Sequence, residues 1–428
     1  MKHTVSEVLL KNGAKGLLIN VPGATVSSYE LNFRAGDYLT PSKSKWETAH
    51  IMEHVILGAN EDYPDTQKFQ AEIHKNGAYT NAYTSYYNIN YVGEAADFEW
   101  ARVLRLQATA ISKPLFLEAE FNAEVGNIRD EMTGRSNQHF WTLASEMTKA
   151  FGFKIPTDKE RAKLIDNVSR EDVIEHYKNT HFTKNMRFVI AGDLLGRRAA
   201  IKDVLESLEL PVGASRHKLP VEQAKKPAKP LFIRNKSVPN IYFGISSVVN
   251  DKLSVAEDDA LGIARVMLTD TLYSNIFGQA REKGLVYAVH SGHHQNSKYA
   301  EWSLSTQVLP QNAPALCDII LREIKKVQKG LIDDADLDAA KQYALGSFER
   351  SMQTVGSVAG AYERYFFDGY IEDMRSIPDR IKAVSKKDIS DVMNRVFAED
   401  IGGIGVLGGE DAGIAQRLHE QLQPLWRV

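Results

Sequence analysis

The chain has 428 residues, of which 43% are hydrophobic, and this length favours two or more domains over a single core. Its 52 Lys and Arg residues are nearly balanced by 55 Asp and Glu residues, which argues against the basic surface that nucleic-acid binding requires. No apolar run is long enough to span a bilayer, no signal-peptide pattern opens the chain and one cysteine cannot form an internal disulfide, so we expect a cytoplasmic protein that binds neither membranes nor nucleic acid.

The first half mixes strand patterns and helix patterns without regular alternation between them. A two-residue apolar period predicts strands, and a 3.6-residue apolar period predicts helices. In chain order we predict a strand at 25–36, a helix at 45–58, a strand at 81–93, helices at 99–111 and 118–132, a helix that begins after Ser169 and a strand at 186–192. Ser169 stands where a helix N-cap is expected, because its hydroxyl can accept a hydrogen bond from the first turn.

The stretch "LPVGASRHKLPVEQAKKPAKP" is rich in Pro and Lys and has no apolar period, which indicates an exposed linker. We therefore predict a first domain at 1–210, a linker at 211–229 and a second domain at 230–428. In the second half we predict strands at 240–248 and 301–309, a helix at 313–330 with Cys317 as a buried apolar residue, a helix after Ser385 and a strand at 401–409.

The two halves match each other at a constant offset, which predicts a duplicated domain. An offset of 216 residues pairs Ile165 with Ile381, Val168 with Val384, Ser169 with Ser385, Asp172 with Asp388 and Gly192 with Gly408. The stretches "KGLLIN" and "KPLFIRN" match loosely at an offset of 214. Because both halves combine neighbouring strands with long helices, we predict the α+β class, with two homologous domains.

The stretch "HIMEH", residues 50–54, places two histidines and a glutamate within the first predicted helix. His50 and His54 are one turn apart, so both imidazoles project from one face and can reach the same ion. Glu53 stands beside them, where its carboxylate can hold a water on that ion. The alternative is an ordinary polar helix face with structural histidines.

A catalytic zinc usually takes three protein ligands and a water, so the motif needs one more residue. The helix at 118–132 carries Glu124 and Glu131, which are two turns apart and share a face. Apolar residues such as Phe121 and Val125 put much of this helix against a core, where a carboxylate needs a partner such as a cation. The alternative is a solvated acidic face.

These residues resemble the signature of the pitrilysin (insulinase) family of zinc metallopeptidases, which includes the mitochondrial processing peptidase subunits. The family has the same inverted motif, followed by a glutamate ligand after 76 residues, and here 76 residues separate His54 from Glu131. Its second glutamate stands seven residues before that ligand, as Glu124 does. The resemblance implies one Zn²⁺ per chain, held by His50, His54 and Glu131. It also implies two homologous α/β-sandwich domains with the mitochondrial-processing-peptidase-like metallohydrolase fold.

The resemblance extends beyond the metal motif. "NGAYTNAYTSYYNINY" resembles a family strand whose edge pairs with the substrate backbone, which implies that Asn81, Ala82 and Thr84 bind substrate. "AREKGLVYAVHSG" resembles the segment that brings an Arg and a Tyr to the peptide, which implies catalytic and substrate-binding roles for Arg281 and Tyr287. The family spacing is one residue longer, which puts the register of Arg281 in question. The alternatives are an ordinary sheet strand, a helix-end Arg and a strand Tyr.

By this resemblance the expected function is a zinc-dependent endopeptidase that hydrolyses unfolded or short peptides in a chamber between the two domains. Glu53 would act as general base and then acid, Glu124 would orient a ligand histidine or tune Glu53, and Tyr287 would donate to the oxyanion or to the peptide backbone. The alternative is a non-catalytic or partner-dependent subunit of a heteromeric peptidase. A different metal-dependent hydrolase on a related fold is weaker. The two-domain length resembles the short class of the family, for which we expect a homodimer, with a heteromer of related subunits as the other arrangement.

Overall fold

The computed structural model describes residues 1–296 and 298–426 and divides into two compact units. Unit 1 comprises Met1–Thr133, Asp158–Pro220 and Ser351–Glu372, and unit 2 comprises Gly134–Thr157, Val221–Arg350 and Asp373–Val428. The predicted linker at 211–229 contains one passage of the chain between the units. Two further segments cross between the units. Residues 134–157, from the first half of the chain, belong to unit 2, and residues 351–372, from the second half, belong to unit 1. The predicted boundaries do not include these crossings.

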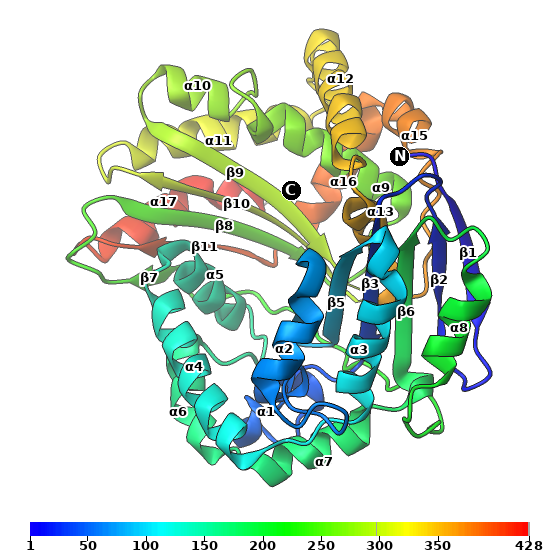
Figure 1. Cartoon of the computed structure of the whole chain (residues 1–428). Helices are drawn as coiled ribbons and strands as arrows, with labels where there is room; N and C mark the ends of the chain where they lie inside the picture. The colour runs from blue at the N-terminus through cyan, green and yellow to red at the C-terminus, as the bar shows by residue number, and fades with distance from the viewer. Residues whose placement is uncertain (297, 427–428) are drawn as a thin grey trace. The chain divides into compact units, whose positions relative to one another are not determined.

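Unit 1 is built on a six-stranded sheet in the order β1-β2-β6-β3-β5-β4 (Figure 1). Only the neighbours β2 and β6 run parallel, and the other neighbours are antiparallel. The strands are β1 (Thr4–Leu9), β2 (Lys15–Asn20), β3 (Val26–Phe33), β4 (Tyr79–Thr84), β5 (Ile89–Ala96) and β6 (Met186–Gly192). The helices are α1 (Thr48–Ile56), α2 (Thr66–His74), α3 (Trp100–Ser112), α4 (Glu118–Ser136), α6 (Asp158–Leu164), α7 (Arg170–Thr180), α8 (Arg198–Glu206), α13 (Val355–Gly360) and α14 (Arg364–Phe367).

Strand β3 shows how the sheet of unit 1 acquires two different faces. Tyr29, Leu31 and Phe33 point to one side and are buried in a core that also contains residues of α1, α3 and α7. Because successive side chains alternate, Glu30 and Asn32 point to the other side. Helix α13 packs against β3 and β6. Both faces of the sheet are therefore covered.

Unit 2 contains a five-stranded sheet in the order β7-β11-β8-β10-β9. The strands are β7 (Leu231–Ile233), β8 (Ile241–Val249), β9 (Val286–Gln295), β10 (Ala300–Val308) and β11 (Gly402–Leu407). The helices are α5 (His139–Ala150), α9 (Val255–Arg265), a π-helical turn η7 (Val266–Asp270), α10 (Phe277–Glu282), α11 (Ala313–Gln328), α12 (Asp334–Ser351), α15 (Ile377–Ala383), α16 (Lys386–Ala398) and α17 (Gly413–Leu422). Its core is formed by apolar residues of the sheet and of α9, α11, α16 and α17.

The internal repeat is visible in the strand register. Leu17 of β2 pairs in parallel with Val189 of β6, and in unit 2 Leu231 pairs in parallel with Gly405. These two pairs are related by the offsets of 214 and 216 found in the sequence. The helices that precede β6 and β11 both begin with a capping box, in which a serine and the aspartate three residues later hydrogen-bond each other's backbone amides. The predicted fold of two homologous α+β domains is confirmed.

The exchanged segments also correspond to each other in the repeat. Residues 139–150 form α5, and an offset of 216 relates them to residues 355–366, which contain α13 and the start of α14. Helix α5, from the first half of the chain, packs on β8 and β11 in unit 2, whereas α13, from the second half, packs on β3 and β6 in unit 1. Each half of the chain thus supplies a helix that packs on the sheet formed by strands of the other half.

Most predicted elements are present within four residues of their expected bounds, including the helices at 45–58 and 118–132, and the strand at 186–192 has the predicted bounds. The stretch 81–93 is different, because β4 and β5 form a hairpin whose turn is closed by a hydrogen bond from the Ser85 amide to the Asn88 carbonyl. Cys317 is buried in α11, as predicted. Within the described residues, every helix is too short or too polar to cross a bilayer.

Candidate active site

Helix α1 carries His50, Glu53 and His54, and the rest of the helix is anchored in the core of unit 1. Ile51 and Met52 are completely buried in this core. Since these apolar contacts fix the rotation of the helix about its axis, the two histidines share the face that is left. Their ring centroids are 5.0 Å apart, so both imidazoles reach the same small region of space.

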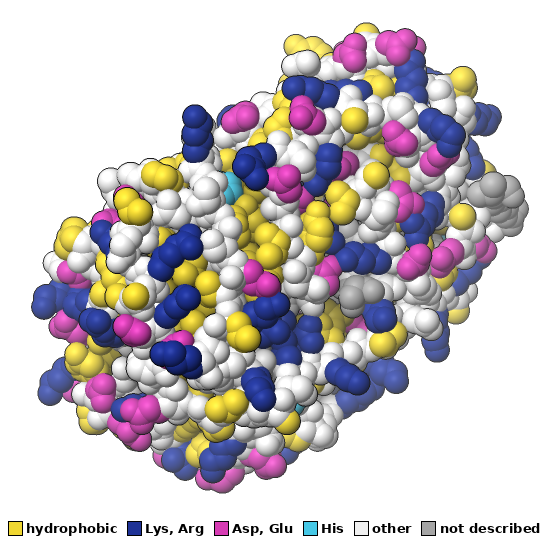
Figure 2. Space-filling model, turned by 90° about the vertical axis from the view of Figure 1, so that its right-hand side faces the viewer, with side chains coloured by type: hydrophobic (Ala, Val, Ile, Leu, Met, Phe, Trp, Pro, Cys, Tyr) yellow, Lys and Arg dark blue, Asp and Glu magenta, His cyan; other side chains and the backbone are white. Residues whose placement is uncertain are grey.

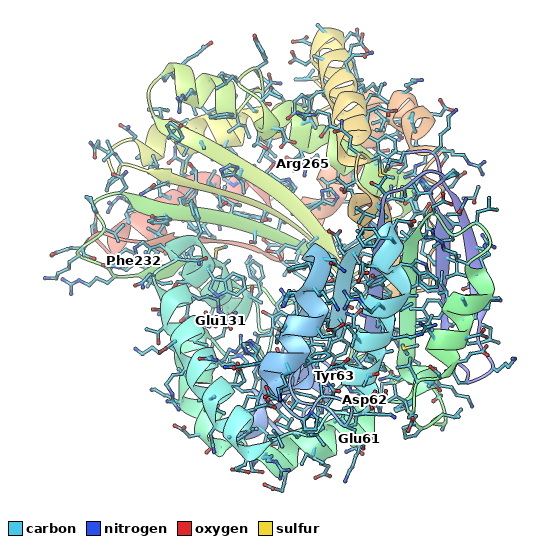
Figure 3. The ribbon with its side chains drawn as sticks, in the orientation of Figure 1. Glu61, Asp62, Tyr63, Glu131, Phe232 and Arg265 are labelled. Carbon is cyan, nitrogen blue, oxygen red and sulfur yellow. The ribbon has the colours of Figure 1, made fainter. Side chains whose placement is uncertain are left out.

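Glu131 reaches this region from α4 (Figure 3). Its Oε2 lies 3.3 Å from Nε2 of His50 and 3.8 Å from Nε2 of His54. Ligand atoms about 2.0 to 2.1 Å from a tetrahedral zinc ion lie about 3.3 Å from one another, so these separations suit such an ion. In the part of the chain that the structure describes, no other three His, Cys, Asp or Glu residues are gathered closely enough to hold a metal.

The raised pKa of His50 indicates that the group favours positive charge. Burial disfavours the imidazolium, but hydrogen bonds to Glu131 and Glu47 outweigh this effect and raise the pKa of His50 to about 9. A divalent cation among the same atoms would satisfy the same carboxylate charge. Two imidazoles and one carboxylate are also the kind of donor set that zinc takes in hydrolytic sites, so the residues fit this metal.

Each histidine is oriented by a second carboxylate. Nδ1 of His54 lies 2.8 Å from Oε2 of Glu124, and Nδ1 of His50 lies 3.1 Å from Oε2 of Glu47. In the tautomer that donates from Nδ1, the Nε2 lone pair is directed away from these carboxylates and toward Glu131. The hydrogen bond from His54 also holds the pKa of Glu124 below its usual range. Glu124 therefore contacts His54 and is not itself one of the three candidate metal ligands.

Glu47 and its partner Arg161 were not predicted from the sequence. Glu47 is completely buried, and Nε and one Nη of Arg161, in α6, donate to its two carboxylate oxygens at 2.6 and 2.9 Å. Burial acts to raise the pKa of Glu47, but hydrogen bonds from His50 and Arg161 lower it to about 2. Glu47 could have been proposed from its position one helical turn before His50. Arg161 lies 114 residues from Glu47, and no local pattern links the two.

Glu53 is a mostly buried carboxylate beside the group of three. Burial raises its pKa, and this effect outweighs the lowering by the two histidines and by the Thr84 hydroxyl of β4. A carboxylate with a raised pKa binds a proton more tightly than an exposed one. The position and the pKa of Glu53 are therefore suited to a general base.

Strand β4 is the last strand of the described sheet of unit 1, where it pairs with β5. Such an edge leaves backbone N–H and C=O groups available to an extended peptide. At Ala82 the amide donates to Oδ1 of Asn81 at 2.9 Å. Asn81 and Ala82 also line a pocket of about 420 Å³ that includes Glu53 and His54. Thr84 lies at the end of the same strand.

Arg281 and Tyr287 belong to unit 2. Arg281 lies in the last turn of α10, and its guanidinium stacks 4.4 Å from the ring centroid of Tyr287, the second residue of the edge strand β9. Tyr287 is 82% exposed. Both residues line a pocket of about 550 Å³ in this unit, together with Phe140 of α5 and His290 of β9. Where the repeat relates unit 2 to the "HIMEH" helix, the chain forms the π-helical turn η7 and lacks the motif.

The face of the molecule in Figure 2 carries Lys and Arg side chains among Asp and Glu side chains. This mixture agrees with the net charge of −3.

Known proteins match the chain in both halves. A family model described as Insulinase (Peptidase family M16) matches residues 16–157, and one described as Peptidase M16 inactive domain matches residues 167–343. The chain is 32% identical to Insulin-degrading enzyme-like 2 of Arabidopsis thaliana over 201 residues, which are 45% of this chain and 21% of that protein. It is 24% identical to the A-factor-processing enzyme of Saccharomyces cerevisiae over 193 residues, or 43% and 19% of the two chains. The chain thus spans about a fifth of the length of these two relatives.

Solved structures match over nearly the whole chain and show the fold. A protease from Helicobacter pylori has a TM-score of 0.81 at 18% identity, with 96% of this chain and 100% of that chain covered. A structure described as peptidase M16 inactive domain, from Pseudomonas fluorescens, has a TM-score of 0.81 at 17% identity, with 96% and 98% covered. The two family models match consecutive parts of the chain. The chain therefore belongs to the insulinase family of peptidases, peptidase family M16.

Proposed function

We propose that this chain is a zinc-dependent endopeptidase that hydrolyses short or unfolded peptides. The observation that carries the proposal is the convergence of His50, His54 and Glu131, with the mostly buried carboxylate of Glu53 beside them. A zinc ion held by these three residues would lower the pKa of a bound water and polarise the scissile carbonyl. Membership of a peptidase family supports the same reaction class.

The residues of unit 1 have distinct tasks in this proposal. Glu53 accepts a proton from the attacking water and later delivers one to the leaving nitrogen. Glu124 and Glu47 hold the two imidazoles with Nε2 directed to the metal. The free edge of β4 binds the peptide backbone by strand addition, which requires no particular sequence because every peptide has the same backbone groups.

In unit 2 we propose that Tyr287 and Arg281 contact the substrate. The exposure of Tyr287 supports this role, because an exposed phenol on an edge strand is available to a ligand. The stacked guanidinium of Arg281 restricts the orientation of the ring. A homodimer and a cytoplasmic location stay predictions.

A second candidate function is a non-catalytic or partner-dependent subunit. The match of residues 167–343 to a model described as an inactive domain favours it. So does the 28% identity to a mitochondrial-processing peptidase subunit beta of Arabidopsis thaliana over 195 residues, which cover 45% of this chain and 32% of that protein. The name of that relative describes a subunit, and we propose the heteromeric arrangement only as the alternative.

The test combines metal content with cleavage of internally quenched peptides. The wild type should retain about one zinc per chain and cleave the peptides. Glu53→Gln should retain the zinc and lose activity by about 10²-fold or more, which is the usual contribution of a general base. Glu131→Ala should lose both. If the zinc-loaded wild type cleaves nothing, alone or mixed with a related subunit, the endopeptidase proposal is wrong and the non-catalytic alternative holds.

A further inference from the structure

The pocket beside Glu53 and His54 has a lining that favours one class of ligand. Its volume is about 420 Å³, enough for one long side chain. Four elements of unit 1 form its walls: the end of α1, the start of α2, strand β4 and the first half of α4. Since Glu53 and His54 belong to the lining, a side chain in this pocket lies next to the reacting peptide bond if the proposed function holds.

Of the three carboxylates in the lining, Glu124 contacts His54 and Glu53 is the proposed general base, which leaves Glu120 for a substrate side chain. The two oxygens of Glu120 are both 3.3 Å from the backbone amide of Ala59, which fixes the carboxylate against the end of α1. Gly58 allows this approach, because a Cβ at that position would be 3.0 Å from Oε2 of Glu120. Among the described residues, no Lys or Arg forms an ion pair with Glu120. Burial and the nearby Glu124 raise its pKa, while the Ala59 amide lowers it.

The rest of the lining offers hydrogen-bond acceptors and little positive charge. The hydroxyl oxygen of Thr66 is buried without a partner. The side-chain N–H of Gln70 donates a hydrogen bond to the Leu57 carbonyl at 2.8 Å, which leaves the side-chain oxygen of Gln70 for a ligand. The one basic side chain in the lining is His54, which already faces Glu124. A donor with several N–H groups is therefore the complementary ligand.

Two kinds of substrate side chain can be compared at this pocket. An apolar side chain would displace water from Glu120 and leave a carboxylate buried without a counter-charge, which is unfavourable. A lysine or arginine would pair with Glu120 and donate its remaining hydrogens to Thr66 and Gln70. Its methylene groups would lie along Val55, Leu57 and Ala82, which supply the apolar part of the lining.

We propose that this pocket selects a lysine or arginine side chain next to the scissile bond, with Glu120 as the specificity-determining residue. The inference rests on the proposed function for its position in the reaction. The physical claim, that the pocket binds a basic side chain, does not depend on turnover.

The experiment uses peptide pairs that differ only at one position, lysine against norleucine, which has nearly the same length but no charge. Binding is measured by fluorescence anisotropy to the zinc-loaded Glu53→Gln protein, and cleavage is measured with the wild type. At the position that enters the pocket, the lysine peptide should bind and be cleaved about tenfold or more better, the usual size of a hydrogen-bonded charge effect. Adding Glu120→Gln should reduce this ratio to about threefold or less.

Glu118→Gln is the matched control, because Glu118 lies on the same helix two residues away but its side chain is 68% exposed. It should preserve the lysine preference. Glu120→Lys should reverse the preference toward a glutamate peptide. The inference is overturned if lysine and norleucine peptides bind equally at every position, or if the preference survives Glu120→Gln. Preferential binding without turnover would keep the inference and reject the proposed function.

Discussion

Nε and an Nη of Arg161 donate hydrogen bonds to both carboxylate oxygens of Glu47, at 2.6 and 2.9 Å. One of these oxygens also lies 3.1 Å from Nδ1 of His50. The pair thus connects α6 to the imidazole that we propose as a metal ligand. We infer that this buried ion pair sets the tautomer and the orientation of His50.

Removing Arg161 should therefore affect both stability and metal affinity. Arg161→Met removes the guanidinium that pairs with the buried charge of Glu47, so the free energy of unfolding of unit 1 should fall by about 3 kcal/mol or more. Zinc affinity should fall by about 10- to 100-fold, as is usual when the partner of a ligand is disturbed. Chelator competition measures the affinity and urea unfolding measures the stability. Arg129→Met, at an exposed ion pair with Asp166, is the control and should change neither.

His54 and Glu124 allow a cleaner test of orientation, because Glu124 is partly exposed and its loss leaves no deeply buried charge. Glu124→Ala should weaken zinc binding by about 10- to 100-fold with little change in the unfolding transition. Glu124→Gln should recover part of the affinity, since an amide oxygen can still accept from Nδ1 of His54. Asn127→Ala removes a hydrogen bond at 3.2 Å to the same oxygen of Glu124 that contacts His54, and it should have a smaller effect than Glu124→Ala. Equal zinc affinity in wild type and Glu124→Ala would contradict the orienting role.

Glu30 should make unit 1 less stable at alkaline pH than at acid pH. Burial, assisted by the charge of Glu363, raises the pKa of Glu30 to about 7, above the unfolded value of about 4.3. The folded state therefore binds this proton more tightly than the unfolded state does. The stabilisation is fully present below about pH 4.3 and is lost as the pH rises through about 7.

Glu30→Gln removes this titration, so its melting temperature should exceed that of the wild type by more at pH 8 than at pH 5. Glu171→Gln, at a carboxylate whose side chain is 75% exposed, should show the same small difference at both pH values. A pH-independent gap between Glu30→Gln and the wild type would show that Glu30 is not protonated at pH 5 in the folded protein.

Gly405 tests how α5 packs on the sheet of unit 2. A Cβ at this position would lie 2.8 Å from side-chain atoms of Leu143 and Met147, both of which belong to α5. Gly405→Ala should therefore lower the free energy of unfolding by about 1 to 3 kcal/mol through overpacking. Gly346→Ala, in α12, meets no atom within 4 Å and should raise stability by up to about 1 kcal/mol. Thermal unfolding of the two variants should move in opposite directions.

Tyr287→Phe tests the proposed contribution of unit 2 to substrate binding. Loss of one hydrogen bond to a substrate or to a developing oxyanion should reduce kcat/KM by about 10-fold or more, with zinc content unchanged. Tyr343→Phe, at a half-exposed tyrosine of α12 in the same unit, is the control and should cleave like the wild type. An unchanged kcat/KM in Tyr287→Phe would remove this residue from the catalytic proposal.

The sequence alone determined the features that depend on neighbours within a few turns. The 3.6-residue apolar period of 45–58 predicts α1, and the spacing in "HIMEH" places His50 and His54 on one face of it. The serines at 169 and 385 predict the N-caps of α7 and α16. The offset of 216 predicts that two similar sheets exist, because duplicated patterns fold into duplicated structures. Each of these inferences uses only backbone geometry and local hydrogen bonding.

Only the tertiary structure decided which distant residues meet. Arg161 reaches Glu47 across 114 residues, and the exchange of α5 and α13 between the units follows from contacts that no local period encodes. The same holds within α4, where Glu118 and Glu120 are both acidic residues of the first turn. Packing against the end of α1 partly buries Glu120 beside the Ala59 amide and leaves Glu118 in solvent, because helix rotation is set by the apolar core and not by the charged residues themselves.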